Sequence, residues 1–203
     1  VFGVAREKVV PIYHGVAHDT FNLKGKAHSS MRPYLLQIAQ YAAKKNVDRV
    51  LQAYSTLDEE TRPDLVAILP NFEGPDPDVP GVRLIREPVT HKDLAPWYRG
   101  ALGFIFPSIH ETFGLPALEA MACGCPVITS SISAMPEMAG DAALLVNPRS
   151  VEEIAAGIQR LVEDEALRRE LRDKGLARAR DFTWARSAEQ HLAVFEAVLV
   201  RDP

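Results

Sequence analysis

The sequence predicts an α/β fold in which helices cover both faces of a doubly wound parallel sheet. Two observations support this prediction. Short apolar runs alternate along the chain with segments whose apolar residues recur at helical spacing, as expected for parallel strands joined by helical crossovers. Runs such as 103–106 are also apolar throughout, which is typical of strands that are buried on both faces.

Each strand is expected where such a run lies between turn-forming residues. The helix after Lys44 carries apolar residues at 47, 50, 51, 54 and 57, the spacing of one helical face. Residues 70–81 are rich in Pro, Asp and Gly and predict an irregular loop. The expected strands are 34–39, 65–69, 82–85, 103–106, 127–129 and 142–146.

Three helix starts carry capping signals. Thr90 to Asp93 and Ser150 to Glu153 both resemble capping boxes, and Asp164 is positioned to cap the helix that follows it. A last helix begins at Thr183-Trp184 and has one apolar face, which we expect to pack in a core. The residues of that face are Ala188, Leu192, Phe195 and Leu199.

Composition narrows the class of protein. The chain has 203 residues, 47% hydrophobic and 25% charged, which is enough for one large domain. A net charge of -4 gives no basic field and argues against a nucleic-acid partner. The sequence shows no apolar run of about 18 residues and no signal peptide at its start. Cys123 and Cys125 are interpreted as small, reduced core residues, which predicts a cytoplasmic protein. Because the first residue is Val, the chain is either processed or part of something longer.

The most informative stretch runs from the strand 103–106 to the strand 127–129. A polar loop, Ser108 to Gly114, leads into a short helix that has Pro116 in its first turn. Such a helix N-terminus attracts phosphate, and the carboxylates of Glu111 and Glu119 flank it with seven residues between them. These features predict a nucleotide-sugar site. The alternative from spacing alone is a solvated loop followed by an ordinary surface helix.

This stretch resembles the donor-site signature of family 4, the group 1 retaining glycosyltransferases of GT-B fold. The resemblance extends, with gaps, from about Val9 to the C-terminus. It implies that a Rossmann-like, nucleotide-sugar-binding domain occupies 31–182 and forms one half of a GT-B enzyme. Residues 1–30 would lead in from a missing N-terminal domain, and 183–203 would form the C-terminal helix. The matching positions are Ser108, Glu111, Phe113 to Pro116, Leu118 to Ala122, Gly124, Pro126 and Val127.

The resemblance also implies roles for individual residues. Glu111 would be catalytic and would stabilise positive charge that develops on the donor sugar. Lys45 would hold the donor diphosphate, and Glu119 would accept hydrogen bonds from the ribose hydroxyls. The other implied donor-binding residues are Val89, near the base, His110, and Phe113, Gly114 and Leu115, through their backbone N–H groups. No metal or cofactor is implied, since the donor, a UDP- or GDP-sugar, is a substrate.

One position departs from the family pattern. Gln40 stands where relatives carry an Arg on the diphosphate, and an amide supplies neither the charge nor the bidentate geometry of a guanidinium. Lys44 is a candidate replacement for that Arg. His14 stands where Asn is common, and we do not expect His14 and His18 to form a zinc site, because Gly15 lies between them and no third ligand follows.

The implied function is metal-independent transfer of a hexosyl group to a glycan or glycolipid acceptor. The acceptor would bind the missing N-terminal domain, so the isolated domain is expected to be inactive. The full enzyme would be cytoplasmic, with peripheral association at the inner membrane face. Lys45-Asn46 is reminiscent of mannosyltransferase-like members and hints at GDP-mannose, with UDP-sugars equally possible.

Two alternatives remain from the sequence. Sugar-nucleotide epimerases and glycogen phosphorylases share the GT-B architecture, but they lack this signature or need a pyridoxal lysine. The second alternative is a non-catalytic nucleotide-binding or interaction module with a degenerate donor site. Gln40, the trimmed 70–81 loop and the absent N-terminal domain favour this module.

Overall fold

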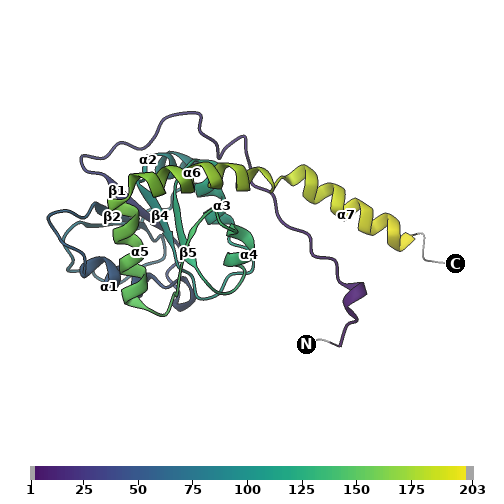
Figure 1. Ribbon diagram of the computed structural model, residues 1–203, viewed down its shortest axis with the longest axis horizontal. Helices are drawn as coiled ribbons and strands as arrows, with labels where there is room; N and C mark the ends of the chain where they lie inside the picture. Colours follow the sequence, from purple (N-terminus) through teal and green to yellow (C-terminus); the bar gives the residue numbers. More distant parts are fainter. Residues whose placement is uncertain (1–2, 200–203) are drawn as a thin grey trace.

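The computed structural model describes residues 3–199. Its core is a sheet of six parallel strands in the order β3-β2-β1-β4-β5-β6, which confirms the predicted doubly wound α/β fold (Figure 1). Each predicted strand overlaps an observed one. The strands are β1 Tyr34–Ile38, β2 Asp64–Ile68, β3 Val82–Ile85, β4 Gly103–Phe106, β5 Val127–Ser130 and β6 Leu144–Val146.

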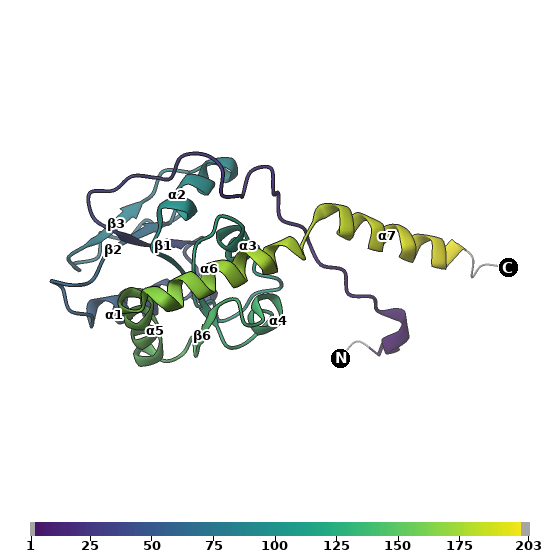
Figure 2. The same cartoon turned by 45° about the horizontal axis from the view of Figure 1, so that its top comes forward.

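Helices cover both faces of this sheet. One face packs against α1 and α5, where Val50 and Ile158 meet Leu35 and Ile105 of the central strands. The other face packs against α2, α3 and α4, and α6 contacts both α3 and α5 (Figures 1 and 2). The α-helices are α1 Val47–Ser55, α2 Ala95–Gly100, α3 Leu115–Ala122, α4 Met135–Ala139, α5 Val151–Glu163, α6 Glu165–Arg180 and α7 Trp184–Leu199, and the short 3-10 helices are η1 Arg6–Lys8, η2 Ala43–Lys45 and η3 His91–Leu94.

The interior contains the residues that the sequence placed there. β4 and β5 are buried along their whole length. β4 is apolar throughout, as expected for a strand covered on both faces, and in β5 the buried Thr129 hydroxyl donates to the Phe106 carbonyl at 2.9 Å. Cys123 and Cys125 are both buried and free, so the prediction of two small, reduced core residues is confirmed. The loop between β2 and β3 has no regular structure from 70 to 81, also as predicted.

The capping predictions have three different outcomes. Asp164 caps α6 through its carboxylate, which accepts from Leu167 N at 2.8 Å, as predicted. The Ser150 hydroxyl caps α5 by accepting from Glu153 N at 3.1 Å. The reciprocal half of that box is absent among the described residues, because Ser150 N already donates to the Asn147 carbonyl at 3.1 Å.

The predicted capping box at Thr90 is wrong. The Thr90 hydroxyl bonds to the Asp93 carboxylate and not to a backbone N–H group. The cause is the tight 3-10 turn of η3, in which Asp93 N donates to the Thr90 carbonyl at 2.9 Å. The N–H group that the hydroxyl would cap therefore already has an acceptor.

The N-terminal segment crosses the start of α7. Val16 N donates to the Phe182 carbonyl at 3.0 Å, and Val16 forms an isolated parallel bridge with Thr183. A Cβ atom on Gly15 would lie 2.1 Å from Trp184 N, so this crossing needs a glycine. Beyond the crossing, residues up to Phe21 turn into the domain, where Phe21 is fully buried. The proposed division of the chain at 30 and 182 stays a prediction.

Two segments that meet at this crossing, residues 3–12 and α7, project away from the body of the domain (Figures 1 and 2). Of the described residues of α7, only Ser187 is buried. Leu192 and Phe195 are 57% and 60% exposed, so the expectation that the apolar face of this helix packs in a core is wrong. The reason is that no other described element lies over that face. Residues 200–203 of the predicted helix lie outside the described residues.

Candidate donor site

The strand order creates a crevice between β1 and β4. The chain leaves these neighbouring strands in opposite directions across the sheet, and ligands of doubly wound sheets bind beyond the carboxyl ends at such a point. The loop after β1 contains η2, and the loop after β4 leads into α3. The two loops touch, because Ile109 N donates to the Lys44 carbonyl at 2.8 Å.

Lys45 and Glu111 meet in this crevice. Lys45 Nζ lies 2.6 Å from Glu111 Oε1, and the two side chains are 20% and 12% exposed. Lys45 Nζ also lies 5.3 Å from the centroid of the Phe106 ring, at the end of β4. The structure therefore brings together the residue predicted to hold the diphosphate and the residue predicted to be catalytic, although 66 positions separate them.

Two polar residues that the sequence reasoning did not assign fix these loops. Asn46 has a left-handed backbone, with φ at 62°, and its amide donates to the carbonyls of Pro107 and Pro148 at 3.0 and 2.6 Å. The Ser133 hydroxyl accepts from Glu111 N at 3.1 Å and donates to the Glu111 carbonyl at 2.8 Å. Asn directly after two lysines was the available signal for Asn46, since Asn tolerates the left-handed region, whereas Ser133 offered none.

Gly114 shapes the N-terminus of α3. It is the residue before the helix and has φ at 98°, and a Cβ atom there would lie 2.7 Å from Met135 Sδ. In the first turn of α3, Pro116 has no N–H group and Ala117 N donates to the Gly114 carbonyl at 3.0 Å. The N–H group of Leu115, the first helical residue, has no intrahelical acceptor and lies at the crevice end of the helix. The Phe113 ring packs edge-on against the Phe182 ring, with the ring centroids 5.7 Å apart, at the crossing of the N-terminal segment and α7.

A pocket of about 280 Å³ lies at the carboxyl ends of β1, β2 and β4. Lys45, Val89 and Gln40 all line it, together with Phe106 and Pro116. Among the described residues that line it, Lys45 is the only charged one. Val89 is thus placed in the same pocket as Lys45, while Gln40 adds a neutral amide at the position where the family pattern predicts an Arg. His110 is exposed beside Glu111.

Glu119 lies on α3 but does not line this pocket. Its side chain is 4% exposed, and its Oε1 lies 2.6 Å from Nε2 of His91, at the start of η3. Tyr98, in α2, donates its hydroxyl to Oε2 at 3.4 Å. Burial raises the pKa of the Glu119 carboxyl, and the hydrogen bond from His91 opposes that rise. Neither His91 nor Tyr98 was assigned a site role from the sequence.

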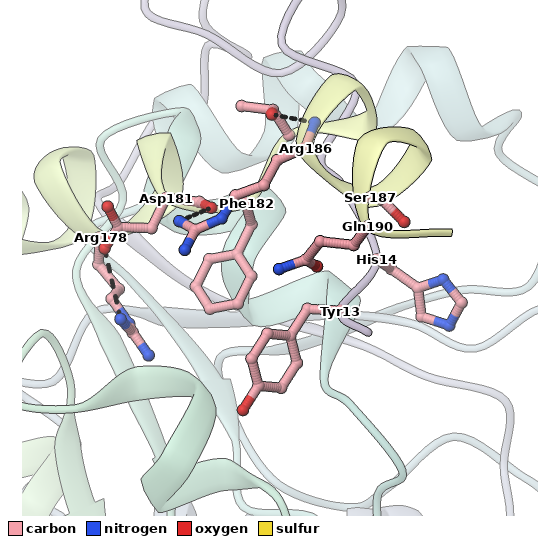
Figure 3. Close-up of a pocket in the computed structure, with 9 residues that line it drawn as sticks. Tyr13, His14, Arg178, Asp181, Phe182, Arg186, Ser187 and Gln190 are labelled. Carbon is pink, nitrogen blue, oxygen red and sulfur yellow. Dashed lines mark hydrogen bonds and ion pairs between the residues drawn. The ribbon is translucent and has the colours of Figure 1, made fainter. Parts of the chain in front are cut away.

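A second hollow, of about 340 Å³, lies where the N-terminal segment crosses α7. Figure 3 shows Tyr13, Phe182 and Gln190 around it, with Arg186 above. His14 is one of its lining residues, while His18 turns to the Phe182 carbonyl, 3.1 Å from its Nε2. Among residues 3–199, no group of three or more His, Cys, Asp or Glu side chains could hold a metal ion.

Comparison with known proteins finds relatives of this chain over the region that forms the site. The family model described as "Glycosyl transferases group 1" matches residues 32–164. The chain is 35% identical over 173 residues to O-antigen chain mannosyltransferase B of Escherichia coli, covering 80% of this chain and 45% of that protein. It is 33% identical over 185 residues to a serotype-specific mannosyltransferase of the same organism, covering 85% of this chain and 22% of that protein.

Solved structures agree on the fold. A glycosyltransferase from Rickettsia africae superposes with a TM-score of 0.83 at 17% identity, covering 98% of this chain and 59% of that one. At that identity the likeness concerns the fold alone. The chain spans less than half the length of either Escherichia coli mannosyltransferase described above.

Proposed function

The chain belongs to the group 1 glycosyltransferases, as a GT-B C-terminal domain, and we propose that it binds the nucleotide-sugar donor of a retaining, metal-independent enzyme. The observation that supports this most strongly is the contact between Lys45 and Glu111 at the crevice between β1 and β4. A cation, a carboxylate and the N-terminus of α3 there provide the groups that a diphosphate and a sugar require.

In this proposal the diphosphate binds between Lys45 and the first turn of α3. The ammonium group of Lys45 then exchanges its ion pair with Glu111 for the phosphates, which carry more negative charge. Backbone N–H groups of Phe113, Gly114 and Leu115 add hydrogen bonds. The nucleobase lies near Val89, in the pocket of about 280 Å³ whose walls are mainly apolar.

Glu111 acts on the sugar once Lys45 has moved to the phosphates. As the bond between the anomeric carbon and the diphosphate oxygen breaks, positive charge grows on the sugar and negative charge grows on the leaving group. A carboxylate beside the sugar and an ammonium beside the phosphates stabilise both charges, and one oriented charge can be worth about 10²-fold in rate. Because Gln40 is neutral, Lys45 is the principal cation beside the departing diphosphate.

We propose a mannosyl group as the sugar transferred. Both Escherichia coli relatives described above carry the name mannosyltransferase, and they match the chain over 80% and 85% of its length. GDP is then the expected nucleotide, with UDP as the competing possibility.

The acceptor would bind a second domain. The chain covers 45% and 22% of the lengths of these two relatives, which leaves room for such a domain in proteins of this kind. The exposed apolar face of α7, with Leu192 and Phe195, fits contact with it. No helix among the described residues combines the length and hydropathy needed to cross a bilayer. We propose a cytoplasmic enzyme that works at the inner membrane face on a glycan or glycolipid acceptor.

Calorimetric titration of the chain with GDP, UDP and ADP tests the donor site. We expect one nucleotide to bind and Lys45→Ala to weaken its binding by about tenfold or more, because a hydrogen bond to a charged group is worth about 1.5–3 kcal/mol. Lys174→Ala is the matched control, since Lys174 pairs with Asp141 and Glu170 away from the crevice. Equal binding by the Lys45→Ala variant and the unmodified chain would contradict the proposed site.

A second candidate function is nucleotide binding without transfer. Gln40 favours it, because the crevice lacks the guanidinium that relatives place on the diphosphate. Measurements on a protein that carries both domains distinguish the two candidate functions. There, Glu111→Ala should leave nucleotide binding in place and slow mannosyl transfer by about 10²-fold or more. Binding with no transfer by the unmodified two-domain protein would support the non-catalytic function.

A further inference from the structure

His91 covers the carboxylate of Glu119. The Glu119 side chain is 4% exposed whereas that of His91 is 61% exposed, and 2.6 Å separates His91 Nε2 from Glu119 Oε1. Against a carboxylate oxygen, Nε2 is the donor. The imidazole therefore separates Glu119 from solvent and occupies one of its two oxygens.

The other hydrogen-bonding partner of Glu119 cannot leave. Tyr98 is fully buried, and its hydroxyl donates to Glu119 Oε2 at 3.4 Å from inside the domain. Burial raises the pKa of the Tyr98 hydroxyl well above its ordinary value, so the hydroxyl keeps its proton and stays a donor. Of these two partners, only His91 lies on the solvent side and can give way to a ligand.

The position of His91 allows such movement. It begins η3, a single 3-10 turn that follows the exposed residue Thr90. Its ring contacts the Phe21 ring at a tilt, with the ring centroids 4.9 Å apart, and most of the side chain is exposed to solvent. A change of side-chain rotamer can therefore uncover Glu119 without unfolding the domain.

We propose that His91 stands in for the ribose hydroxyls on Glu119 in the free protein and must swing away when the nucleotide binds. This inference rests on the proposed function, a nucleotide-sugar site in this crevice, and on the ribose role that the family resemblance implies for Glu119. Two vicinal hydroxyls need acceptors, and His91 holds Oε1 at 2.6 Å. The hydrogen bond from His91 is thus a cost that ribose binding has to offset, which makes His91 a determinant of donor affinity.

Three ligands and two variants of the chain test this assignment by calorimetry. The ligands are the nucleoside diphosphate that binds, its 2′,3′-dideoxy analogue and inorganic pyrophosphate. His91→Ala removes the competing donor and should tighten binding of the nucleoside diphosphate by about three- to tenfold. The dideoxy analogue and pyrophosphate lack the ribose hydroxyls, so their affinities should not change.

His91→Gln is the matched variant. Its amide nitrogen lies about as far from the backbone as the imidazole Nε2 and can donate the same hydrogen bond, so nucleoside diphosphate affinity should stay near that of the unmodified chain. A purely structural effect of residue 91 would shift all three ligands together. Thermal unfolding of both variants shows whether the fold is retained.

The outcomes distinguish this inference from the proposed function. If the unmodified chain binds the nucleoside diphosphate and His91→Ala binds it equally or more weakly, the role of His91 is overturned and the donor site stands. The role of His91 is also overturned if His91→Ala binds the dideoxy analogue more tightly than the unmodified chain does. The same holds if His91→Gln binds the nucleoside diphosphate as tightly as His91→Ala does. If no variant binds any nucleotide, the donor site and the role of His91 fall together.

Discussion

Single residues at the crevice combine backbone geometry with chemistry. Gly114 shows this combination, because its φ of 98° turns the chain from the loop into α3 and its missing side chain makes room for Met135. Lys45 and Glu111 contribute the chemistry, through their charged side chains. Their ion pair in the free protein keeps each charge compensated, at 20% and 12% exposure, until a ligand offers a better partner.

We expect Gly114→Ala to destabilise the domain by about 2–3 kcal/mol. An L side chain is strained at this φ by about 1–2 kcal/mol, and its Cβ atom would lie 2.7 Å from Met135 Sδ, which has to shift. Urea denaturation measures the change. Gly25→Ala is the control, because Gly25 has a similar φ of 102°. A Cβ atom there would meet only the end of the flexible Arg99 side chain, at 3.2 Å, so this variant should cost about 1 kcal/mol. Equal losses for the two variants would contradict the packing argument.

At the scale of elements, helix starts with similar sequences are stabilised differently. Ser150 and Thr90 both precede a helical segment by one residue and are followed three residues later by an acidic residue. Only the Ser150 hydroxyl accepts a hydrogen bond from a backbone N–H group, because α5 begins with an α-helical turn while η3 begins with a 3-10 turn. The hydrogen-bonding state of one N–H group thus decides whether a hydroxyl acts as a cap.

This difference predicts a contrast between two substitutions. Ser150→Ala removes an acceptor for Glu153 N and should cost about 0.5–2 kcal/mol of unfolding free energy. Thr90→Ala removes only an exposed contact with the Asp93 carboxylate and should change stability by less than about 0.5 kcal/mol. Chemical denaturation of both variants under one condition provides the comparison. A larger loss for Thr90→Ala would show that its hydroxyl caps the helix in solution.

At the scale of the whole molecule, a compact domain carries two projecting segments. Gly15 lets the N-terminal segment cross the start of α7, and from that crossing both segments leave the body on the same side (Figures 1 and 2). The exposed apolar residues of α7 therefore contribute little to the stability of the domain itself. Contact with a second, acceptor-binding domain is the role proposed for them above.

Replacing Leu192 and Phe195 together by Glu should change the unfolding free energy of the chain by less than about 0.5 kcal/mol. Both residues are more than half exposed in the folded chain, so replacing them removes little buried apolar surface. Ile158→Ala, in the fully buried core between α5 and the sheet, is the contrast and should cost about 2–5 kcal/mol. A loss of similar size for the α7 variant would show that α7 packs against the domain in solution.

The sequence by itself determined the strands, their parallel arrangement and the place of the candidate site. These follow from local patterns, because apolar runs, helical spacing and turn residues act over a few neighbours. The Phe113-Gly114-Leu115-Pro116 run and Glu111 likewise identified the family that the comparisons show. The carboxyl ends of parallel strands then fix where a ligand can bind.

Only the tertiary structure decided which polar side chains meet and which apolar face stays exposed. Glu111 pairs with Lys45 across 66 positions and Glu119 with His91 across 28, contacts that depend on how loops from different strands converge. The face of α7 has the same helical spacing as a buried one, yet it is exposed. Periodicity records that a face is apolar, but burial requires another element over it, and that is a property of the assembled molecule.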